Sequence, residues 1–595
     1  MNKNQNSDDK NSKNLQWDLT LLYQSKDDPQ IEKDLKIYEE KRRAFAEKYK
    51  DRTDYLLDED QLLAALTEYE NLIDELNGGR PLIYYHYLTS IEAQNHQAHA
   101  ELNRVTTKLT KAHNHLTFFP IKLGQIDHAL QTKFLKAEKL KRYRFLLQQR
   151  FKLAKYDLKD SQEKILNLTD HTSYQMWVEG VEKSLNQKTV DFHGVDLPLS
   201  AAAQKIPELP DKERQDLHQK LLEKTGEVEE FAESEINAIV NYKQMDDELR
   251  GHNKPYQATM LNSDNDQETI LNLVDLVTKN FDLAHQFYEL KAKLLKKKQL
   301  SYADRSAKLD SFSTKYEFAE AKKIVNQTFA NLDPQFEKIL QKMLKNKQID
   351  IYPRQGKVSG AFCSSSTNNP TFVLLNHTDD FNSVTTFAHE MGHAIHSELS
   401  KQQPVIYQGY STSTAETAST FFEQFVFDRL ITDFDEKQKI VALHNKIQDD
   451  INTIFRQVAL FNFELELHEA IKTSGFLSAQ EIGHLLNKHT AAYLGPLFEL
   501  TDLDGRFFIL WSHIRYYFYT YTYAYGHLIS KALVKKTKDK PEFVQKVKQF
   551  LSAGGSDTPK NIFAGIGIDI SQPEFFKAGL EEIRGDVEKL RGLVG

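Results

Sequence analysis

Apolar residues that recur three and four positions apart are the feature that most limits how this chain can fold. The pattern runs from Trp17 to about residue 185 and resumes from Asp211 to about Lys347, with lysine and glutamate between the apolar positions. Such spacing places apolar side chains on one face of a helix. Two short stretches differ: Thr189 to Leu199 alternates like a small hairpin or turn, and Thr371 to Asn376 is a β-rich apolar run between turn formers. We therefore expect a mostly α-helical fold with a small β-sheet.

Length and proline positions predict how the chain is divided. At 595 residues the chain exceeds what one ordinary hydrophobic core requires. Pro198, Pro207 and Pro210 separate the first helical region from the next. We predict a disordered polar tail over residues 1–16, an N-terminal helical lobe over 17–200 and a catalytic lobe over 201–595.

Composition excludes several classes of protein. The 77 basic and 85 acidic residues give a net charge of −8 without blocks of one sign, which argues against a nucleic-acid partner. No apolar stretch approaches the roughly 18 residues that span a bilayer, and the N-terminus lacks the apolar core of a secretory signal. The single cysteine, Cys363, fits a reducing cytoplasm and excludes zinc sites built from several thiolates. Any metal must then be held by histidines and carboxylates.

Residues 389–393 read His-Glu-Met-Gly-His within a segment of helical spacing that follows Asp380 and Asn382, two suitable N-caps. His389 and His393 are one turn apart, so both imidazoles can meet one cation. Glu390 lies beside them, where a carboxylate can hold a metal-bound water and take its proton. Chance would supply such a motif about 0.1 times in a chain of this composition. The motif therefore needs a third ligand to support it.

A third ligand is available downstream. The pattern His-Glu-x-x-His-x-x-Gly-x-x-His is excluded, because positions 396 and 399 hold His396 and Leu399. The other solution is a glutamate from the following helix, and Glu416 comes just after the capping residues Tyr410 to Thr414. Glu423 lies on the same helical face, where it either bonds a ligating imidazole or is a surface carboxylate. We expect His396 to pack or to form a hydrogen bond rather than to bind the metal.

Residues 511–526 contain six tyrosines. Alternation from Tyr517 to Tyr525 suggests a strand, whereas Tyr516, Tyr519 and Tyr523 form a helical stripe, so periodicity does not decide between them. The segment serves either aromatic packing or catalysis. In the catalytic interpretation, a tyrosine hydroxyl and His513 donate hydrogen bonds to the oxyanion of a tetrahedral intermediate.

Five blocks of sequence resemble the oligoendopeptidase F group of the thimet-oligopeptidase family of zinc peptidases. The blocks follow the order of the family from the middle of the chain to its end, and the N-terminal helical region also resembles it. They are Ser359-Gly-Ala361 with Asn369-Pro370 and the run to Asn376, Phe387 to Ser397, Ala415 to Ser419, the tyrosine-rich stretch, and Leu551 to Asp557.

The resemblance implies a helical clamshell with a deep central channel, zinc-binding helices at its floor and a small sheet beside the site. It also implies that residues 371–376 pair their backbone with an extended peptide, and that residues 511–526 are helical. One zinc ion would be held by His389, His393 and Glu416. Glu390 would be the base. His513 and a tyrosine would stabilise the oxyanion, with Tyr521 the first choice and Tyr519 or Tyr523 the next.

The resulting prediction is a cytoplasmic, zinc-dependent endopeptidase that cuts internal bonds of short oligopeptides through a zinc-bound water activated by Glu390. Two alternatives are a zinc carboxypeptidase of similar helical fold and a peptide-binding protein without hydrolytic activity. Cobalt or manganese could use the same ligands. Cys363 is either a structural thiol or a source of thiol sensitivity near the site.

Overall fold

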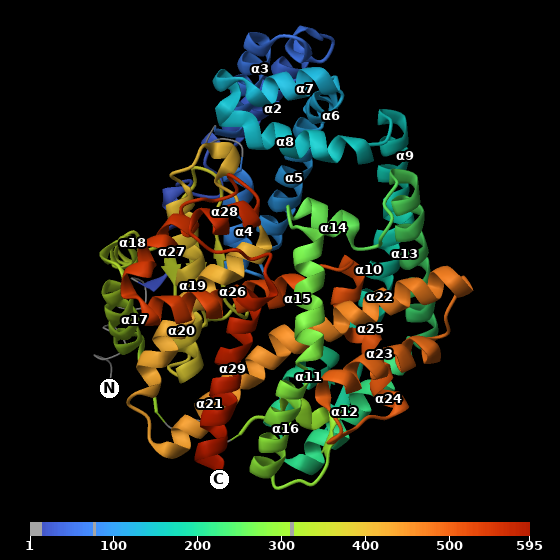
Figure 1. Cartoon of the computed structure of the whole chain (residues 1–595), viewed down its shortest axis with the longest axis vertical. Helices are drawn as coiled ribbons and strands as arrows, with labels where there is room; N and C mark the ends of the chain where they lie inside the picture. Colours follow the sequence, from blue (N-terminus) through green and yellow to red (C-terminus); the bar gives the residue numbers. More distant parts are fainter. Residues whose placement is uncertain (1–14, 75–78, 310–313) are drawn as a thin grey trace. The chain divides into compact units, whose positions relative to one another are not determined.

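The computed structural model describes residues 15–74, 79–309 and 314–595, and most of them are helical, which confirms the predicted mostly α-helical class (Figure 1). The chain forms two compact units. Unit 1 contains residues 1–157, 314–430 and 536–568, and unit 2 contains residues 158–313, 431–535 and 569–595. Most of the predicted tail, residues 1–14, lies outside the described residues.

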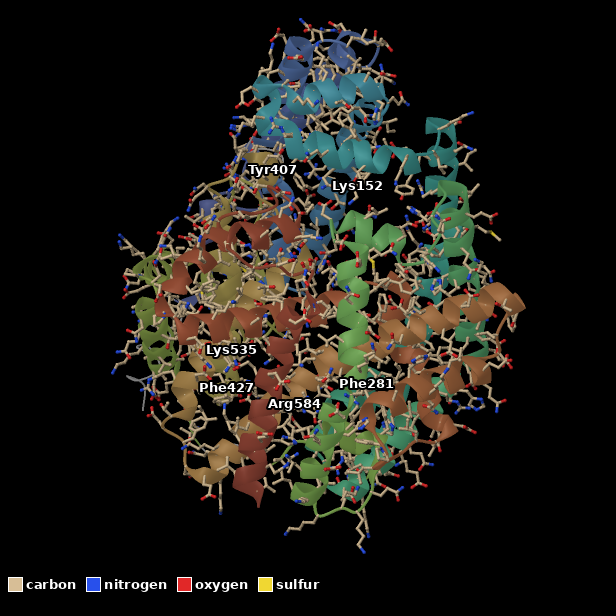
Figure 2. All side chains as sticks on the ribbon, viewed as in Figure 1. Lys152, Phe281, Tyr407, Phe427, Lys535 and Arg584 are labelled. Atoms are coloured by element: carbon tan, nitrogen blue, oxygen red, sulfur yellow. The ribbon has the colours of Figure 1, made fainter. Side chains whose placement is uncertain are left out.

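These units do not follow the predicted division near residue 200, because segments distant in sequence pack together. Tyr407, labelled in Figure 2, shows this within unit 1. The backbone N–H of Leu146 donates to the Tyr407 hydroxyl at 3.2 Å, and that hydroxyl donates to the carbonyl of Arg142 at 3.0 Å. Local periodicity predicts helices but contains no information on such pairings.

Unit 1 is mainly helical, and each of its three sequence segments contributes helices. They are α2 (Gln30–Tyr49), α3 (Glu59–Asp74), α4 (Arg80–Ile91), α5 (His96–His113), α6 (Phe118–Gly124), α7 (His128–Lys136), α8 (Arg144–Leu153), α17 (Phe318–Leu332), α18 (Pro334–Lys345), α19 (Phe381–Ser400), α20 (Thr412–Ile431), α27 (Val544–Leu551) and α28 (Pro559–Gly565).

Unit 2 is also mainly helical. Its helices are α9 (Asp160–Asp170), α10 (Met176–Asn186), α11 (Leu199–Lys205), α12 (Asp211–Gly226), α13 (Glu229–Arg250), α14 (Gln257–Asn262), α15 (Gln267–Lys279), α16 (Asp282–Leu295), α21 (Glu436–Asp450), α22 (Arg456–Ser474), α23 (Ala479–Leu494), α24 (Asp502–Gly505), α25 (Phe507–Leu510), α26 (Tyr521–Asp539) and α29 (Pro573–Val594). The predicted hairpin is confirmed as the antiparallel strands β1 (Thr189–Phe192) and β2 (Val195–Pro198). A parallel pair joins β3 (Leu300–Ser301) to β7 (Phe498–Glu499).

A three-stranded sheet in unit 1 has the order β4-β6-β5. Its central strand β6 (Phe372–Leu374) runs parallel to β4 (Ile349–Asp350) and antiparallel to β5 (Phe362–Ser364). The predicted strand at 371–376 is therefore present, but the expectation that it pairs with a peptide is wrong, because both of its edges are already paired. The edge of the sheet that packs on α19 is formed by β5.

The N-terminal segment is joined to this sheet by polar contacts in the protein interior. The Trp17 indole donates to the carbonyl of Val373 at 2.7 Å, and the Trp17 backbone N–H donates to Asp350 at 3.2 Å. Asp350 is fully buried and also pairs with Arg354 and Lys357. A buried carboxylate is costly unless it is paired in this way, so these contacts tie the N-terminal segment at Trp17 to β4 and β6.

Helix α19 begins where the sequence predicts, since the Asp380 carboxylate accepts the backbone N–H of Ser383 at 2.7 Å. It packs closely against α20 at Gly392. A Cβ atom at Gly392 would lie 2.7 Å from Ser419 Cα and 3.1 Å from the carbonyl oxygen of Ala418. Glycine therefore permits the backbones of the two helices to approach each other.

Among residues 15–74, 79–309 and 314–595, no helix combines the length and the apolar character needed to cross a membrane.

Replacing Gly392 with alanine tests this packing. The added methyl group meets backbone atoms that no side-chain rotation can move, so we expect Gly392→Ala to destabilise unit 1 by about 1–3 kcal/mol. The measurement is the midpoint of thermal unfolding. Gly585→Ala in α29 is the matched control, because an added Cβ there meets nothing within 4 Å and alanine favours a helix by about 1 kcal/mol. Equal midpoints for the two variants would contradict the proposed close contact.

Candidate active site

The structure brings together the three predicted metal ligands within unit 1. His389 and His393 lie one turn apart on α19, with ring centroids separated by 5.0 Å, and Glu416 lies on α20. His389 Nε2 is 3.6 Å from Glu416 Oε2, and His393 Nε2 is 3.9 Å from Glu416 Oε1. One donor atom from each of the three residues lies within 4.8 Å of the others. Two imidazoles and one carboxylate in this arrangement are a donor set that suits zinc.

Glu423 lies seven residues, about two helical turns, after Glu416 on α20. It contacts the Nδ1 side of the His389 ring, whereas Glu416 faces Nε2. Glu423 Oε2 is 2.9 Å from His389 Nδ1, a distance at which the ring N–H donates to the carboxylate. This bond orients the ring and leaves Nε2 directed at Glu416. Burial lowers the pKa of His389, but the bond to Glu423 and the surrounding carboxylate charges raise it overall to about 9. The site therefore favours positive charge.

His393 is affected differently, since burial and the charge of His389 lower its pKa to about 4. A neutral imidazole with a free nitrogen lone pair is the form that binds a metal.

Glu390 lies on α19 between the two histidines and is buried, with 7% of its surface exposed. Burial raises its pKa to about 7, and the positive charge of His389 and a hydrogen bond from the backbone of Cys363 oppose this rise. A carboxyl group with a pKa near neutrality can accept a proton and release it again at neutral pH. Its contact with Cys363 also places β5 directly beside α19.

His396 packs in the interior, as predicted, and is not part of the cluster. Its ring stacks on Tyr410 with centroids 3.6 Å apart and an interplanar angle of 10°. Burial, together with the charge of His393, lowers its pKa to about 3.

Two residues that shape this site were not singled out from the sequence. The Ser419 hydroxyl lies 3.2 Å from both the carboxylate and the backbone carbonyl of Glu416, so it can help to hold the Glu416 side chain. Gly392 permits the approach of α20, as described above. Both could have been recognised from the sequence. Ser419 stands one helical turn after Glu416, and Gly392 lies inside a helix, where glycine is unfavourable unless packing requires it.

The tyrosine-rich segment belongs to unit 2 and combines two helical parts with an irregular turn. A 3₁₀ helix covers Ser512–Tyr516, and α26 begins at Tyr521. Of the predicted helical segment 511–526, residues 512–516 and 521–526 are helical, whereas residue 511 and residues 517–520 are not. The Tyr519 hydroxyl lies 2.8 Å from His513 Nδ1 and 3.5 Å from the Tyr523 hydroxyl, and the Tyr523 ring stacks on His513. These three side chains are partly exposed and form one polar cluster.

Tyr521, the first choice for the oxyanion role, has different surroundings. Its side chain is fully buried in unit 2, and its hydroxyl accepts a hydrogen bond from Asn265 at 3.0 Å. Burial raises the pKa of Tyr521. Its neighbours Tyr519 and Tyr523, in contrast, hold their hydroxyls next to His513.

The sequence matches known peptidases over most of its length. Residues 210–582 match peptidase family M3, and residues 122–179 match the family described as oligopeptidase F. Oligopeptidase PepF of Bacillus subtilis is 27% identical over 57% of this chain and 51% of the relative, so that match spans about half of the relative's length. An oligoendopeptidase F homolog of Borreliella burgdorferi is 25% identical over 96% of this chain and 98% of the relative.

Solved structures share the fold. A crystal structure of a peptidase from Chlamydophila abortus is 23% identical, covers 98% of both chains and superposes with a TM-score of 0.84. Oligoendopeptidase F from Enterococcus faecium is 20% identical, covers 95% of this chain and 98% of that one, and gives a TM-score of 0.71. The match to the family model over residues 210–582, more than half of the sequence, shows that the chain belongs to peptidase family M3.

Proposed function

We propose that this enzyme is a zinc-dependent endopeptidase that hydrolyses internal bonds of short oligopeptides. The observation that carries the proposal is the cluster of His389, His393 and Glu416, whose donor atoms lie within 4.8 Å of one another beside the buried carboxyl of Glu390. The names of its relatives, oligopeptidase and oligoendopeptidase, support oligopeptides as the substrate class.

The residues fit a catalytic zinc site. Two imidazole nitrogens and one carboxylate oxygen leave a coordination position open, as catalytic zinc sites require. Glu423 supports the assignment, because metal-binding histidines usually donate their second ring N–H to a carboxylate. When bound, zinc supplies a Lewis acid that polarises the peptide carbonyl and lowers the pKa of a coordinated water to about 7.

Glu390 then takes a proton from the attacking water. The water oxygen forms a bond to the carbonyl carbon, and the C–N bond breaks as Glu390 returns the proton to the leaving amine. Both transfers suit a carboxyl whose pKa burial raises to about 7. The proton balance therefore needs no further acid.

The substrate backbone is placed along β5, the edge strand beside α19. Edge strands offer backbone groups to an added extended chain, and β5 adjoins Glu390 through Cys363. A cavity of about 360 Å³ lies between this sheet and the start of α19, lined by residues that include Gly360, Asn376 and Ser383. It offers room for a substrate side chain. The unpaired thiol of Cys363 supports a reducing compartment such as the cytoplasm.

The oxyanion role is assigned to His513 with Tyr519, and Tyr523 supports the pair. Tyr519 is preferred to Tyr521, because its hydroxyl bonds His513 and its side chain is partly exposed, whereas Tyr521 is fully buried. Burial and the charge of Arg456 lower the pKa of His513. A neutral His513 has one ring N–H. In the tautomer that carries it on Nδ1, this N–H donates to the Tyr519 oxygen and leaves the Tyr519 O–H free to donate to the oxyanion.

Glu390→Gln tests the assigned base. The amide keeps the shape of the side chain but cannot take a proton, so we expect kcat on a quenched oligopeptide to fall by about 10²–10⁴-fold while the zinc content per chain stays unchanged. Glu320→Gln, an exposed change on α17, is the control. Activity equal to the control would exclude Glu390 as the base. Mass spectrometry of the products separates internal cleavage from the stepwise loss of single residues, and the latter would identify a carboxypeptidase.

Tyr519→Phe and Tyr521→Phe test the oxyanion assignment as a matched pair. Loss of one donor to the oxyanion lowers kcat by about 10²–10³-fold, and we expect this loss for Tyr519→Phe. For Tyr521→Phe we expect lower thermal stability with little change in kcat, since that hydroxyl bonds Asn265. Steady-state kinetics of both variants decide the assignment, and the opposite pattern would return the role to Tyr521.

A further inference from the structure

Two consecutive residues of unit 2 adopt a left-handed backbone between His513 and Tyr519. Tyr517 has φ 47° and ψ 99°, and Phe518 has φ 59°. This region is costly for bulky L-residues and persists only where the surroundings fix it. The strained turn links the two residues assigned to the oxyanion, so the contacts that fix the turn affect their proposed catalytic role.

A buried carboxyl group on α22 holds the second residue of the turn. The backbone N–H of Phe518 donates to Glu464 Oε1 at 3.0 Å. Glu464 is fully buried, and the Phe518 ring packs against His468 and Phe461 of the same helix. A backbone N–H that is buried without an acceptor would disfavour this conformation. Glu464 supplies that acceptor.

Glu464 is predominantly neutral at pH 7, because burial raises its pKa to about 8. A neutral carboxyl group can still accept the Phe518 N–H through its carbonyl oxygen. A glutamine side chain has nearly the same shape and the same acceptor. Charge is therefore not required for the contact.

Other contacts hold the turn and the residues that precede it. Thr259 donates to the carbonyl of Tyr517 at 2.8 Å, and the Tyr517 hydroxyl donates to the carbonyl of Ile239 at 3.0 Å. On the His513 side, Arg515 forms two hydrogen bonds to the buried Glu235, at 2.9 and 2.6 Å. His513 and Tyr519 are six residues apart, and the contacts above hold residues that lie between them. The 2.8 Å contact between the two side chains therefore depends on the backbone conformation of residues 514–518.

We propose that Glu464 is a positioning residue for the His513–Tyr519 pair: by accepting the Phe518 N–H it fixes the left-handed turn that brings the Tyr519 hydroxyl to His513. The inference rests on the proposed oxyanion role of these two residues.

The test compares Glu464→Gln with Glu464→Met. Glutamine keeps an acceptor for the Phe518 N–H, so its kcat should stay within about twofold of the original, whereas methionine should lower kcat by about 10- to 100-fold with little change in KM, as for a displaced catalytic group. Zinc content per chain is measured alongside. Glu469→Met, an exposed change on the same helix, is the control and should keep its kcat. Equal kcat for Glu464→Met and the control would overturn the proposal.

A double-variant cycle distinguishes positioning from a general structural role. If Glu464 acts through Tyr519, Glu464→Met should lower kcat far less in Tyr519→Phe protein than in the original. An equal loss in both backgrounds would overturn the proposal. If Glu464→Met does not fold, Glu464→Asp takes its place, because the shorter side chain keeps the carboxyl but withdraws it from Phe518.

Failure of the underlying function gives a different result. Unchanged kcat in Tyr519→Phe alone would reject the oxyanion role, and with it the reason for positioning. A lowered kcat in Tyr519→Phe with an unchanged kcat in Glu464→Met would reject only the role of Glu464.

Discussion

The close approach of α19 and α20 at Gly392 is the constraint on which the metal cluster depends. His389 and His393 are fixed relative to each other by helical geometry alone, but Glu416 reaches them only because the two backbones nearly touch. Further contacts then set the side chains: Glu423 orients the His389 ring, and Ser419 lies within hydrogen-bond distance of the Glu416 carboxylate. The site is thus built from one short helix–helix contact and a few directed hydrogen bonds.

Burial gives the neighbouring titratable groups of this cluster different properties. It raises the pKa of Glu390 and lowers that of His393, while the carboxylate partners raise the pKa of His389. These shifts suit the proposed roles of the two groups: His393 as a neutral metal ligand and Glu390 as a base that titrates near neutral pH. Loss of contact with water therefore raises the pKa of the carboxyl group of Glu390 and lowers that of the imidazole of His393.

The features that could be predicted from the sequence are those whose determining interactions are local. The spacing of His389 and His393, the Asp380 cap and the 189–199 hairpin all follow from contacts within a few residues, and the structure has each of them. Glu416 could be named because a capped helix follows the motif. The composition of each unit could not be predicted, since it depends on pairings such as Leu146 with Tyr407.

Two details of the site could not be predicted from local sequence patterns. The β-rich apolar run at residues 371–376 indicated a strand but could not show that its edges are occupied by β4 and β5. In the tyrosine-rich segment, the left-handed turn at Tyr517 and Phe518 shifts the helical phase between His513 and α26. Periodicity assumes an unbroken helix, so it could not distinguish Tyr519 from Tyr521. The turn between the two helical parts is held by contacts with residues distant in sequence, such as the hydrogen bond from the Phe518 N–H to Glu464.

The most direct test of the account is X-ray absorption at the zinc edge of the purified protein, with the zinc content of the original and of His393→Ala measured in parallel. The account predicts one zinc per chain, bound by nitrogen and oxygen at about 2.0–2.2 Å with the scattering of two imidazoles, and a marked loss of zinc in the variant. A sulfur neighbour at about 2.3 Å, or full zinc content in His393→Ala, would contradict it.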